Sequence, residues 1–369
     1  MTISQAHAPE AVSVEDPDVQ AVWQPIARDG VPDLAAQHVL ASTLVGLSRA
    51  GVAQRLGADW TPFADLVPAG GVPHLVRNVL RYLEIRGVTE SSGIEWAGAE
   101  PAPGSEHGGR WRLTERGAVL LSEVGSSLLG FYVEAYGPVL ARVGGLLDGT
   151  VDYGPDVERD TEALGRRCEP MTISFLARLL RRLMDARGAH SVLELGCGTG
   201  GLALHMARTD PRFRAIGLDI APDAIALASG RLAGSGLADR VGFVLGDAFR
   251  PDTWPAEAAD CDFYLAVGAL HEQFRDGADA VVDLLSRYRS LLAARPGRVL
   301  LLAEPELQIN EGDAEYYLVH VLTKQGFPQG RQAWLDVIAA AGLRCERVYA
   351  QPNVEFRFAF YEITAGDPA

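Results

Sequence analysis

Short apolar runs alternate with helix-like segments through the second half of the chain. The runs lie at residues 191–195, 214–219, 241–248, 262–267 and 298–304. Between them apolar residues recur every three or four positions, as in residues 278–293. Strands that are apolar throughout and separated by amphipathic helices are typical of a parallel sheet covered on both faces. Two more strands, predicted at 343–349 and 355–361, would form a hairpin at the end of the chain.

The first half of the chain has a different pattern. Helical spacing of apolar residues predicts helices over 35–56 and 72–86, and short extended segments follow at 88–90 and 110–114. Thr114 can cap a helix that begins at Glu115. This order of elements predicts a mainly helical, winged-helix-like domain over residues 1–150, followed by linker helices and an α/β domain over 151–369.

A glycine-rich loop follows the first apolar run. The segment from Ser191 to Gly200 reads Ser-Val-Leu-Glu-Leu-Gly-Cys-Gly-Thr-Gly and leads directly into a helical pattern. Glycines at this spacing allow a sharp turn, partly at positive φ, and close approach of a ligand to the main chain. Glu194 would repel a phosphate but suits a cation, so the loop predicts a ligand other than a dinucleotide.

The pattern Glu194, Gly196, Gly198 and Gly200 resembles the first motif of class I methyltransferases that use S-adenosylmethionine (SAM). The resemblance implies a Rossmann-like sheet with SAM at the carboxyl ends of its strands. It further implies cofactor contacts from residues at the ends of the next two apolar runs. These are Asp219, expected at the ribose hydroxyls, and Asp247 with the adjacent Ala248, expected near the adenine.

Composition indicates which classes of binding partner to expect. The formal net charge of −15 disfavours nucleic acid, whose partners usually present a basic face, and favours a small-molecule acceptor. The cysteines lack C-x-x-C spacing, which indicates reduced thiols of a cytoplasmic protein. No apolar run approaches membrane-spanning length, so we expect no membrane partner.

The predicted N-terminal domain leaves two alternatives. Arg77, Arg81 and Arg86 lie on or beside the predicted helix 72–86, as in a DNA-reading winged helix. The order of elements is also similar to the N-terminal domain of small-molecule O-methyltransferases. That resemblance implies a homodimer and a domain that closes over the substrate.

His271 is the first candidate catalytic residue, because residues just beyond the strands of an open α/β sheet line its ligand site. Its segment resembles the one that carries the general base of O-methyltransferases, with Glu272 in place of the usual aspartate. A neutral imidazole can take a proton from a hydroxyl near physiological pH.

His320 is the second candidate, in an apolar segment that follows the fifth run. The combination of His271, Glu272 and His320 is similar to metal-dependent 2-oxo acid C-methyltransferases related to phenylpyruvate methyltransferase. That resemblance implies a zinc or iron ion held by His271 and His320, acting as a Lewis acid.

Several functions therefore stay open. They are metal-assisted C-methylation, O-methylation with His271 as base, N-methylation, a SAM-binding winged-helix regulator, and a protein that binds SAM without methyl transfer. Residues expected near the pocket from their position alone are Met171, Glu304, Asn310, Tyr316 and Arg331.

Overall fold

The computed structural model describes residue 13 and residues 15–97, 100–101, 109–308, 312–326, 329–350 and 358–366. By their packing the residues divide into two compact units, Met1–Leu121 and Ser122–Ala369. The domain boundary predicted after residue 150 falls inside the second unit, and as a functional division it stays a prediction.

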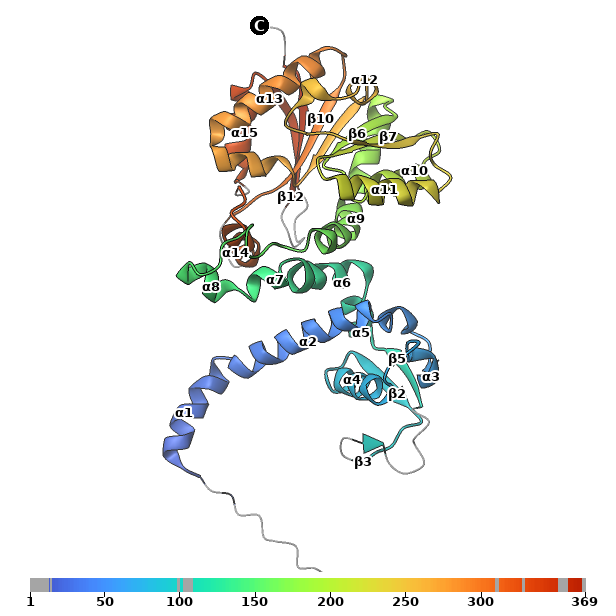
Figure 1. The fold of residues 1–369 in the computed structure, drawn as a ribbon, viewed down its shortest axis with the longest axis vertical. Helices are drawn as coiled ribbons and strands as arrows, with labels where there is room; N and C mark the ends of the chain where they lie inside the picture. The colour runs from blue at the N-terminus through green and yellow to red at the C-terminus, as the bar shows by residue number, and fades with distance from the viewer. Residues whose placement is uncertain are drawn as a thin grey trace, which may run out of the picture. The chain divides into compact units, whose positions relative to one another are not determined.

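A seven-stranded mixed sheet forms the centre of the second unit (Figure 1), in the order β11-β12-β10-β9-β6-β7-β8. Neighbouring strands are parallel except that β12 is antiparallel to both β10 and β11. This arrangement confirms the predicted α/β sheet. The strands are β6 (Ser191–Leu195), β7 (Arg214–Asp219), β8 (Val241–Leu245), β9 (Phe263–Val267), β10 (Val299–Pro305), β11 (Arg344–Ala350) and β12 (Phe358–Thr364).

Helices cover both faces of this sheet, which explains why its strands are apolar throughout. Leu300 and Leu302 pack with Trp334 on one face, whereas Leu301 packs with Leu180 on the other. The first face is covered by α12 (Ala256–Ala259), α13 (Ala278–Ala293) and α15 (Arg331–Ala340). The second face is covered by α9 (Thr161–Arg187), α10 (Gly201–Thr209) and α11 (Pro222–Ala233).

Shorter helices complete the second unit. They are α6 (Glu123–Gly130), η2 (Phe131–Ala135), α7 (Gly137–Leu140), α8 (Val143–Asp148), η3 (Pro251–Thr253), η4 (Leu270–Asp276) and α14 (Ala314–Leu322). The element η2 is a single π-helical segment that continues α6. Its Phe131 stacks on Tyr316 of α14 with 6.2 Å between ring centroids, so residues far apart in sequence form one aromatic cluster.

The first unit combines helices with a three-stranded antiparallel sheet of order β1-β5-β2. The sequence α4, β2, β5, α5 matches the predicted order, and Thr114 Oγ1 caps α5 by accepting a hydrogen bond from Gly117 N. The helix predicted over 35–56 is divided between α2 and η1. The elements are α1 (Pro17–Arg28), α2 (Val31–Arg49), η1 (Ala53–Arg55), β1 (Thr61–Pro62), α3 (Phe63–Leu66), α4 (Pro73–Ile85), β2 (Thr89–Ser92), β3 (Trp96–Ala97), β4 (Glu100–Pro101), β5 (Arg110–Leu113) and α5 (Glu115–Leu120).

The arginines of α4 pack within their own unit. The Arg77 guanidinium lies 4.8 Å from the centroid of the Phe63 ring, and that of Arg81 lies 4.6 Å from the Trp96 ring. Arg81 also pairs with Glu84 at 2.8 Å. Two of the cations that suggested DNA recognition are therefore engaged by neighbouring side chains.

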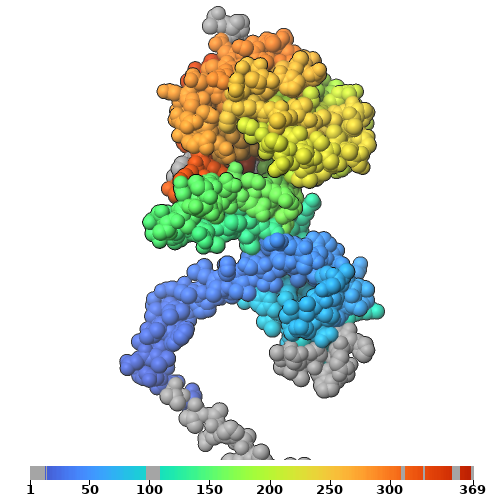
Figure 2. Space-filling view, in the orientation of Figure 1, coloured from blue at the N-terminus to red at the C-terminus, as the bar shows by residue number. Residues whose placement is uncertain are grey.

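The helix pair α1 and α2 exposes apolar side chains. No residue of α1 is buried, and Trp23 and Leu34 are 63% and 66% exposed. In Figure 2 the dark-blue α1 stands out from the rest of its unit.

None of the helices in the described ranges combines the length and apolarity needed to cross a bilayer.

Candidate active site

The glycine loop joins β6 to α10 as predicted. Gly196, Gly198 and Gly200 have φ values of 73°, 51° and 73°, a conformation that residues with a Cβ rarely adopt. A Cβ at Gly200 would lie 2.3 Å from the Phe243 ring, whereas a Cβ at Gly198 would meet nothing within 4 Å. The loop thus packs tightly on one side and leaves space beside its main chain on the other.

The two predicted cofactor acids lie at the ends of neighbouring strands β7 and β8. Asp219 accepts hydrogen bonds from Gly198 N at 2.8 Å and from Ala221 N at 2.9 Å. Asp247 accepts one from Phe249 N at 2.8 Å. Each carboxylate oxygen has more than one acceptor site, so both side chains keep capacity for a ligand while the backbone fixes their orientation.

Buried aromatic donors hold the residues after β8. The Tyr288 hydroxyl donates to the carbonyl of Ala248 at 2.6 Å, and Trp254 Nε1 donates to the carbonyl of Asp247 at 2.8 Å. Tyr288 belongs to α13, so a helix of the sheet's first face fixes the segment that carries the predicted adenine contacts.

Glu194 is a buried carboxyl in β6, only 7% exposed. Burial, with the negative charges of Glu169 and Asp219, raises its pKa to about 8. A cation beside it would relieve this burial and charge repulsion. The surroundings of Glu194 therefore favour the positively charged ligand that the sequence predicted.

His271 pairs with Glu304 at the neighbouring ends of β9 and β10. The distance from His271 Nδ1 to Glu304 Oε2 is 2.7 Å, and the two side chains are 4% and 0% exposed. Glu304 Oε1 accepts hydrogen bonds from Ala269 N and Leu270 N. Because an ionised carboxylate only accepts hydrogen bonds, the contact requires a proton on Nδ1 of His271. In the neutral imidazole the lone pair of Nε2 can then act as a base.

His320 lies beside His271, with 5.4 Å between ring centroids. Its Nδ1 donates to the carbonyl of Tyr316 at 2.8 Å, which leaves the lone pair on Nε2. Burial is the main cause that lowers the pKa of His320 to about 3. His320 is therefore neutral at physiological pH.

Glu272 is engaged differently from its neighbour. Its carboxylate lies 3.6 Å from a guanidinium nitrogen of Arg159, which precedes α9. The structure thus brings His271, His320 and Glu304 together, whereas Glu272 pairs with Arg159. The catalytic role expected for Glu272 stays a prediction.

Other predicted pocket residues have varied surroundings. Met171 packs against the cluster around Phe131, and the Tyr316 ring lies 4.4 Å from that of His320. Arg331 forms a two-point ion pair with Glu306. Asn310 lies outside the described residues.

Sequence reasoning named Glu304 as a pocket residue but missed its bond to His271. It also missed Arg159 and Glu169 altogether. No local motif marks these residues, and the only signal for Glu304 was its position at the end of an apolar run.

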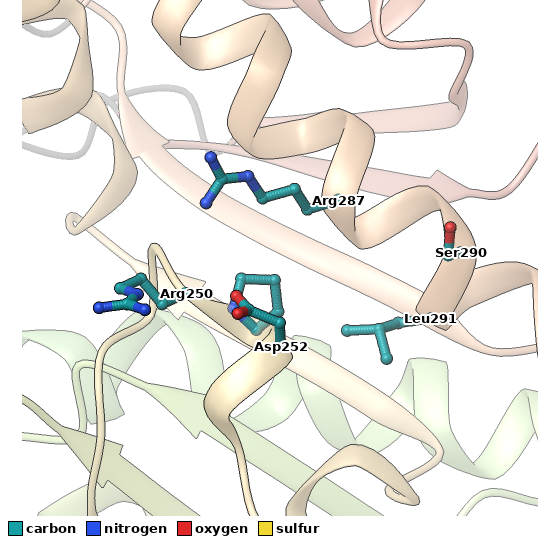
Figure 3. A pocket seen from close by; sticks show the side chains of 6 residues that line it. Arg250, Asp252, Arg287, Ser290 and Leu291 are labelled. Atoms are coloured by element: carbon teal, nitrogen blue, oxygen red, sulfur yellow. The ribbon is translucent and has the colours of Figure 1, made fainter.

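A surface groove of about 630 Å³ lies elsewhere on the second unit (Figure 3), lined by Arg250, Pro251, Asp252, Arg287, Ser290 and Leu291. Arg287 donates from its guanidinium to the carbonyl of Phe249 at 3.2 Å. None of the predicted cofactor or catalytic residues lines this groove, so it is not part of the candidate active site.

Comparison with known proteins agrees with this geometry. Residues 192–293, which include the glycine loop, match the family model described as a methyltransferase domain. The chain has the fold of the Rossmann-like class I methyltransferases, with a mainly helical N-terminal region. Among curated proteins it is 27% identical over 215 residues to the methyltransferase ungE' of Aspergillus campestris, a match that covers 55% of this chain and 62% of the relative.

Solved structures share the fold over nearly the whole chain. Human N-acetylserotonin methyltransferase, solved with SAM, is 17% identical with a TM-score of 0.65 and covers 97% of this chain and 100% of that one. Mitomycin 7-O-methyltransferase is 20% identical with a TM-score of 0.62 and covers 93% and 99%. A riboflavin-analogue N,N-dimethyltransferase from Streptomyces davawensis is 20% identical with a TM-score of 0.60 and covers 92% and 99%.

Proposed function

We propose that the protein is a SAM-dependent methyltransferase acting on a small molecule in natural-product biosynthesis. The match of residues 192–293 to a methyltransferase domain supports the reaction class. Support for the substrate class comes from the similar structures, whose names include mitomycin and riboflavin-analogue methyltransferases.

The residues present fit SAM. The backbone beside Gly198 is open, the carboxylates of Asp219 and Asp247 lie at adjacent strand ends, and burial with the charges of Glu169 and Asp219 destabilises the ionised form of Glu194. In this proposal Asp219 accepts hydrogen bonds from the ribose, Asp247 lies near the adenine and Glu194 compensates the positive end of the cofactor.

The buried His271–Glu304 pair is the observation that favours catalysis over binding alone. When bound, SAM would supply the methyl group of its sulfonium, with S-adenosylhomocysteine (SAH) as the leaving group. His271 Nε2 takes the proton that the acceptor's hydroxyl or amine loses as its new bond to carbon forms. Glu304 holds the imidazole in the required tautomer and stabilises the imidazolium that results.

Two measurements test this proposal. Calorimetric titration should show SAH binding, and purified protein incubated with SAM should release SAH with some member of a panel of phenols, amines and 2-oxo acids. Failure of the wild-type protein to bind SAH would exclude the proposed function. Binding without turnover on any acceptor would favour a SAM-binding protein that does not transfer the methyl group.

Metal-assisted C-methylation of a 2-oxo acid is the second candidate, and one observation favours it. His271 and His320 each donate a hydrogen bond from Nδ1, to Glu304 and to the Tyr316 carbonyl. Each therefore keeps a lone pair on Nε2, the state in which imidazoles usually ligate metals. The described residues contain no group of three or more potential ligands. The two imidazoles would hold zinc or iron, and the acceptor and water would complete the shell; such an ion supplies Lewis acidity.

Metal analysis separates the two candidates. The C-methylation proposal expects one metal ion per chain in wild-type protein and none in the His271→Ala, His320→Ala double variant. It also expects activity to be lost in chelator and restored by added metal. Chelator-resistant turnover would leave O- or N-methylation with His271 as base.

The regulator hypothesis has a test of its own. A SAM-binding winged-helix regulator would bind duplex DNA with affinity that falls steeply as salt increases. The stacking of Arg77 and Arg81 on aromatic rings and the net charge of −15 do not support this function.

A further inference from the structure

A cluster of three side chains joins α9, the glycine loop and α11. Glu169 of α9 accepts hydrogen bonds from Thr199 Oγ1 at 2.7 Å and from both terminal nitrogens of Arg231 at 2.6 and 2.8 Å. Arg231 also donates to the carbonyl of Thr199 at 2.9 Å. We call Glu169, Thr199 and Arg231 the loop clamp, because they bind both the side chain and the main chain of a loop residue.

The clamp is built into the start of α10. A Cβ at Gly201 would lie 1.9 Å from the carboxyl carbon of Glu169, so glycine is required for the carboxylate to lie there. Negative charge is favourable at the N-terminus of a helix. The clamp thus lies next to the glycines that leave space for a ligand.

The charges around the clamp explain why it needs Arg231. Glu169 and Glu194 are close enough for the charge of Glu169 to raise the pKa of Glu194. Burial alone would raise the pKa of Glu169 as well, but hydrogen bonds from Arg231 and Thr199 outweigh it and lower that pKa. Arg231 therefore keeps one of two neighbouring carboxyl groups ionised and fixed in place.

We propose that Glu169 and Arg231 are positioning residues for the cofactor, which act by holding Thr199 and the glycine loop in the shape that binds SAM. This inference rests on the proposed function. The side chains of Arg231 and Glu169 are 35% and 21% exposed, and a part-exposed ion pair adds little to global stability. The geometry of the bonds to Thr199 gives the pair a local role instead.

SAH affinity measured in a double-mutant cycle tests the clamp. Glu169→Gln and Arg231→Met should each weaken SAH binding about tenfold, and the double variant should lose no more than either single variant, because each residue acts through the other. Asp185→Asn serves as the matched control. Asp185 lies on the same helix and pairs with Arg212 at 3.1 Å, and both of these side chains are more exposed than those of Glu169 and Arg231. Its SAH affinity should equal that of the wild type.

Hydrogen exchange separates positioning from a general loss of stability. In Glu169→Gln the amides of residues 197–201 should exchange faster while the melting temperature stays within about two degrees of the wild type. Unchanged SAH affinity in both single variants would overturn the proposal, as would additive losses or a melting temperature that falls in proportion to the affinity. If the wild-type protein binds no SAH, the proposed function fails instead, so the two failures are distinguishable.

Discussion

At the scale of single residues, the His271–Glu304 pair and the predicted cofactor acids belong to different strands of the sheet. His271 follows β9 and Glu304 lies near the end of β10, whereas Asp219 ends β7 and Asp247 follows β8. In the proposed function, proton removal and cofactor binding therefore depend on different side chains. A substitution in the pair should affect turnover without affecting the cofactor.

We predict that His271→Ala lowers kcat at least about 100-fold, the usual contribution of a general base, and leaves SAH affinity unchanged. Glu304→Gln should also lower kcat, because one amide oxygen cannot accept both from the backbone N–H groups and from His271 Nδ1, and a neutral amide does not stabilise the imidazolium. Initial rates and calorimetry measure both effects. His74→Ala, which changes an exposed histidine of α4, is the control. Loss of SAH affinity in parallel with kcat would contradict the assignment.

The raised pKa of Glu194 predicts that cofactor affinity depends on pH. Its pKa of about 8 means that, below pH 8, the free protein holds a proton that must leave before the carboxylate can pair with the ammonium group that SAM and SAH share. SAH affinity should therefore rise as pH increases from 6 to 8, by up to about tenfold per pH unit, and then level off. Glu194→Gln should remove this dependence. Calorimetry in buffers of different ionisation enthalpy should detect release of close to one proton per chain, and a wild-type affinity independent of pH would refute the prediction.

The same group has the opposite effect on folding. Because the carboxyl binds its proton more tightly in the folded chain than in the unfolded one, rising pH between about 4.5 and 8 lowers the free energy of unfolding. Ligand binding should reverse that trend. Protonation of Glu194 thus stabilises the ligand-free protein and lowers its affinity for the cofactor.

At the scale of elements, the loops at the sheet's carboxyl edge are held by helices of the two opposite faces. Helix α13 fixes the segment after β8 through Tyr288, and α9 fixes the glycine loop through Glu169. Each contact combines a buried or half-buried side chain with a main-chain or side-chain group of the loop. Helix packing and loop shape are therefore coupled.

We predict that Tyr288→Phe leaves the Ala248 carbonyl without its donor and lowers the free energy of unfolding by about 1–3 kcal/mol. It should also weaken SAH binding, since Asp247 is adjacent. The matched control is Tyr264→Phe, because the Tyr264 hydroxyl is likewise bound to a carbonyl, that of Ala259, at 2.6 Å. The two variants should lose similar stability in thermal melts, and only Tyr288→Phe should lose affinity. Equal affinities would show that the loop does not depend on α13.

At the scale of the whole molecule, the exposed apolar surface of α1 and α2 points to self-association. Val19, Val22, Trp23 and Leu34 are each more than half exposed. A second copy of the chain would remove such a surface from water, which is the dominant favourable term in most protein association. We therefore propose a homodimer formed through the first unit.

Light scattering should give twice the chain mass at micromolar concentration. Trp23→Glu should shift the protein towards the monomer, because it introduces a charge at the apolar surface. Ile85→Glu changes a residue of α4 that is 69% exposed and should leave the dimer intact. A wild-type protein of single-chain mass would rule out the dimer.

The sequence alone determined the elements and the order of the acids along the chain. Apolar runs bounded by glycine or acidic residues located the strands β6 to β10 to within about three residues, because a strand buried on both faces has little choice of side chain. The same runs fixed which acids follow which strands. Glu194, Asp219, Asp247 and His271 could therefore all be named in advance.

Only the tertiary structure decided which of these residues meet. His271 and Glu304 are 33 positions apart, and they bond because β9 and β10 are neighbours with Val267 paired to Ala303. Glu169 and Arg231 are 62 positions apart, and they meet because α9 and α11 cover the same face of the sheet. Strand order and helix packing depend on long-range burial rather than on local pattern, so no spacing along the chain encodes these pairs.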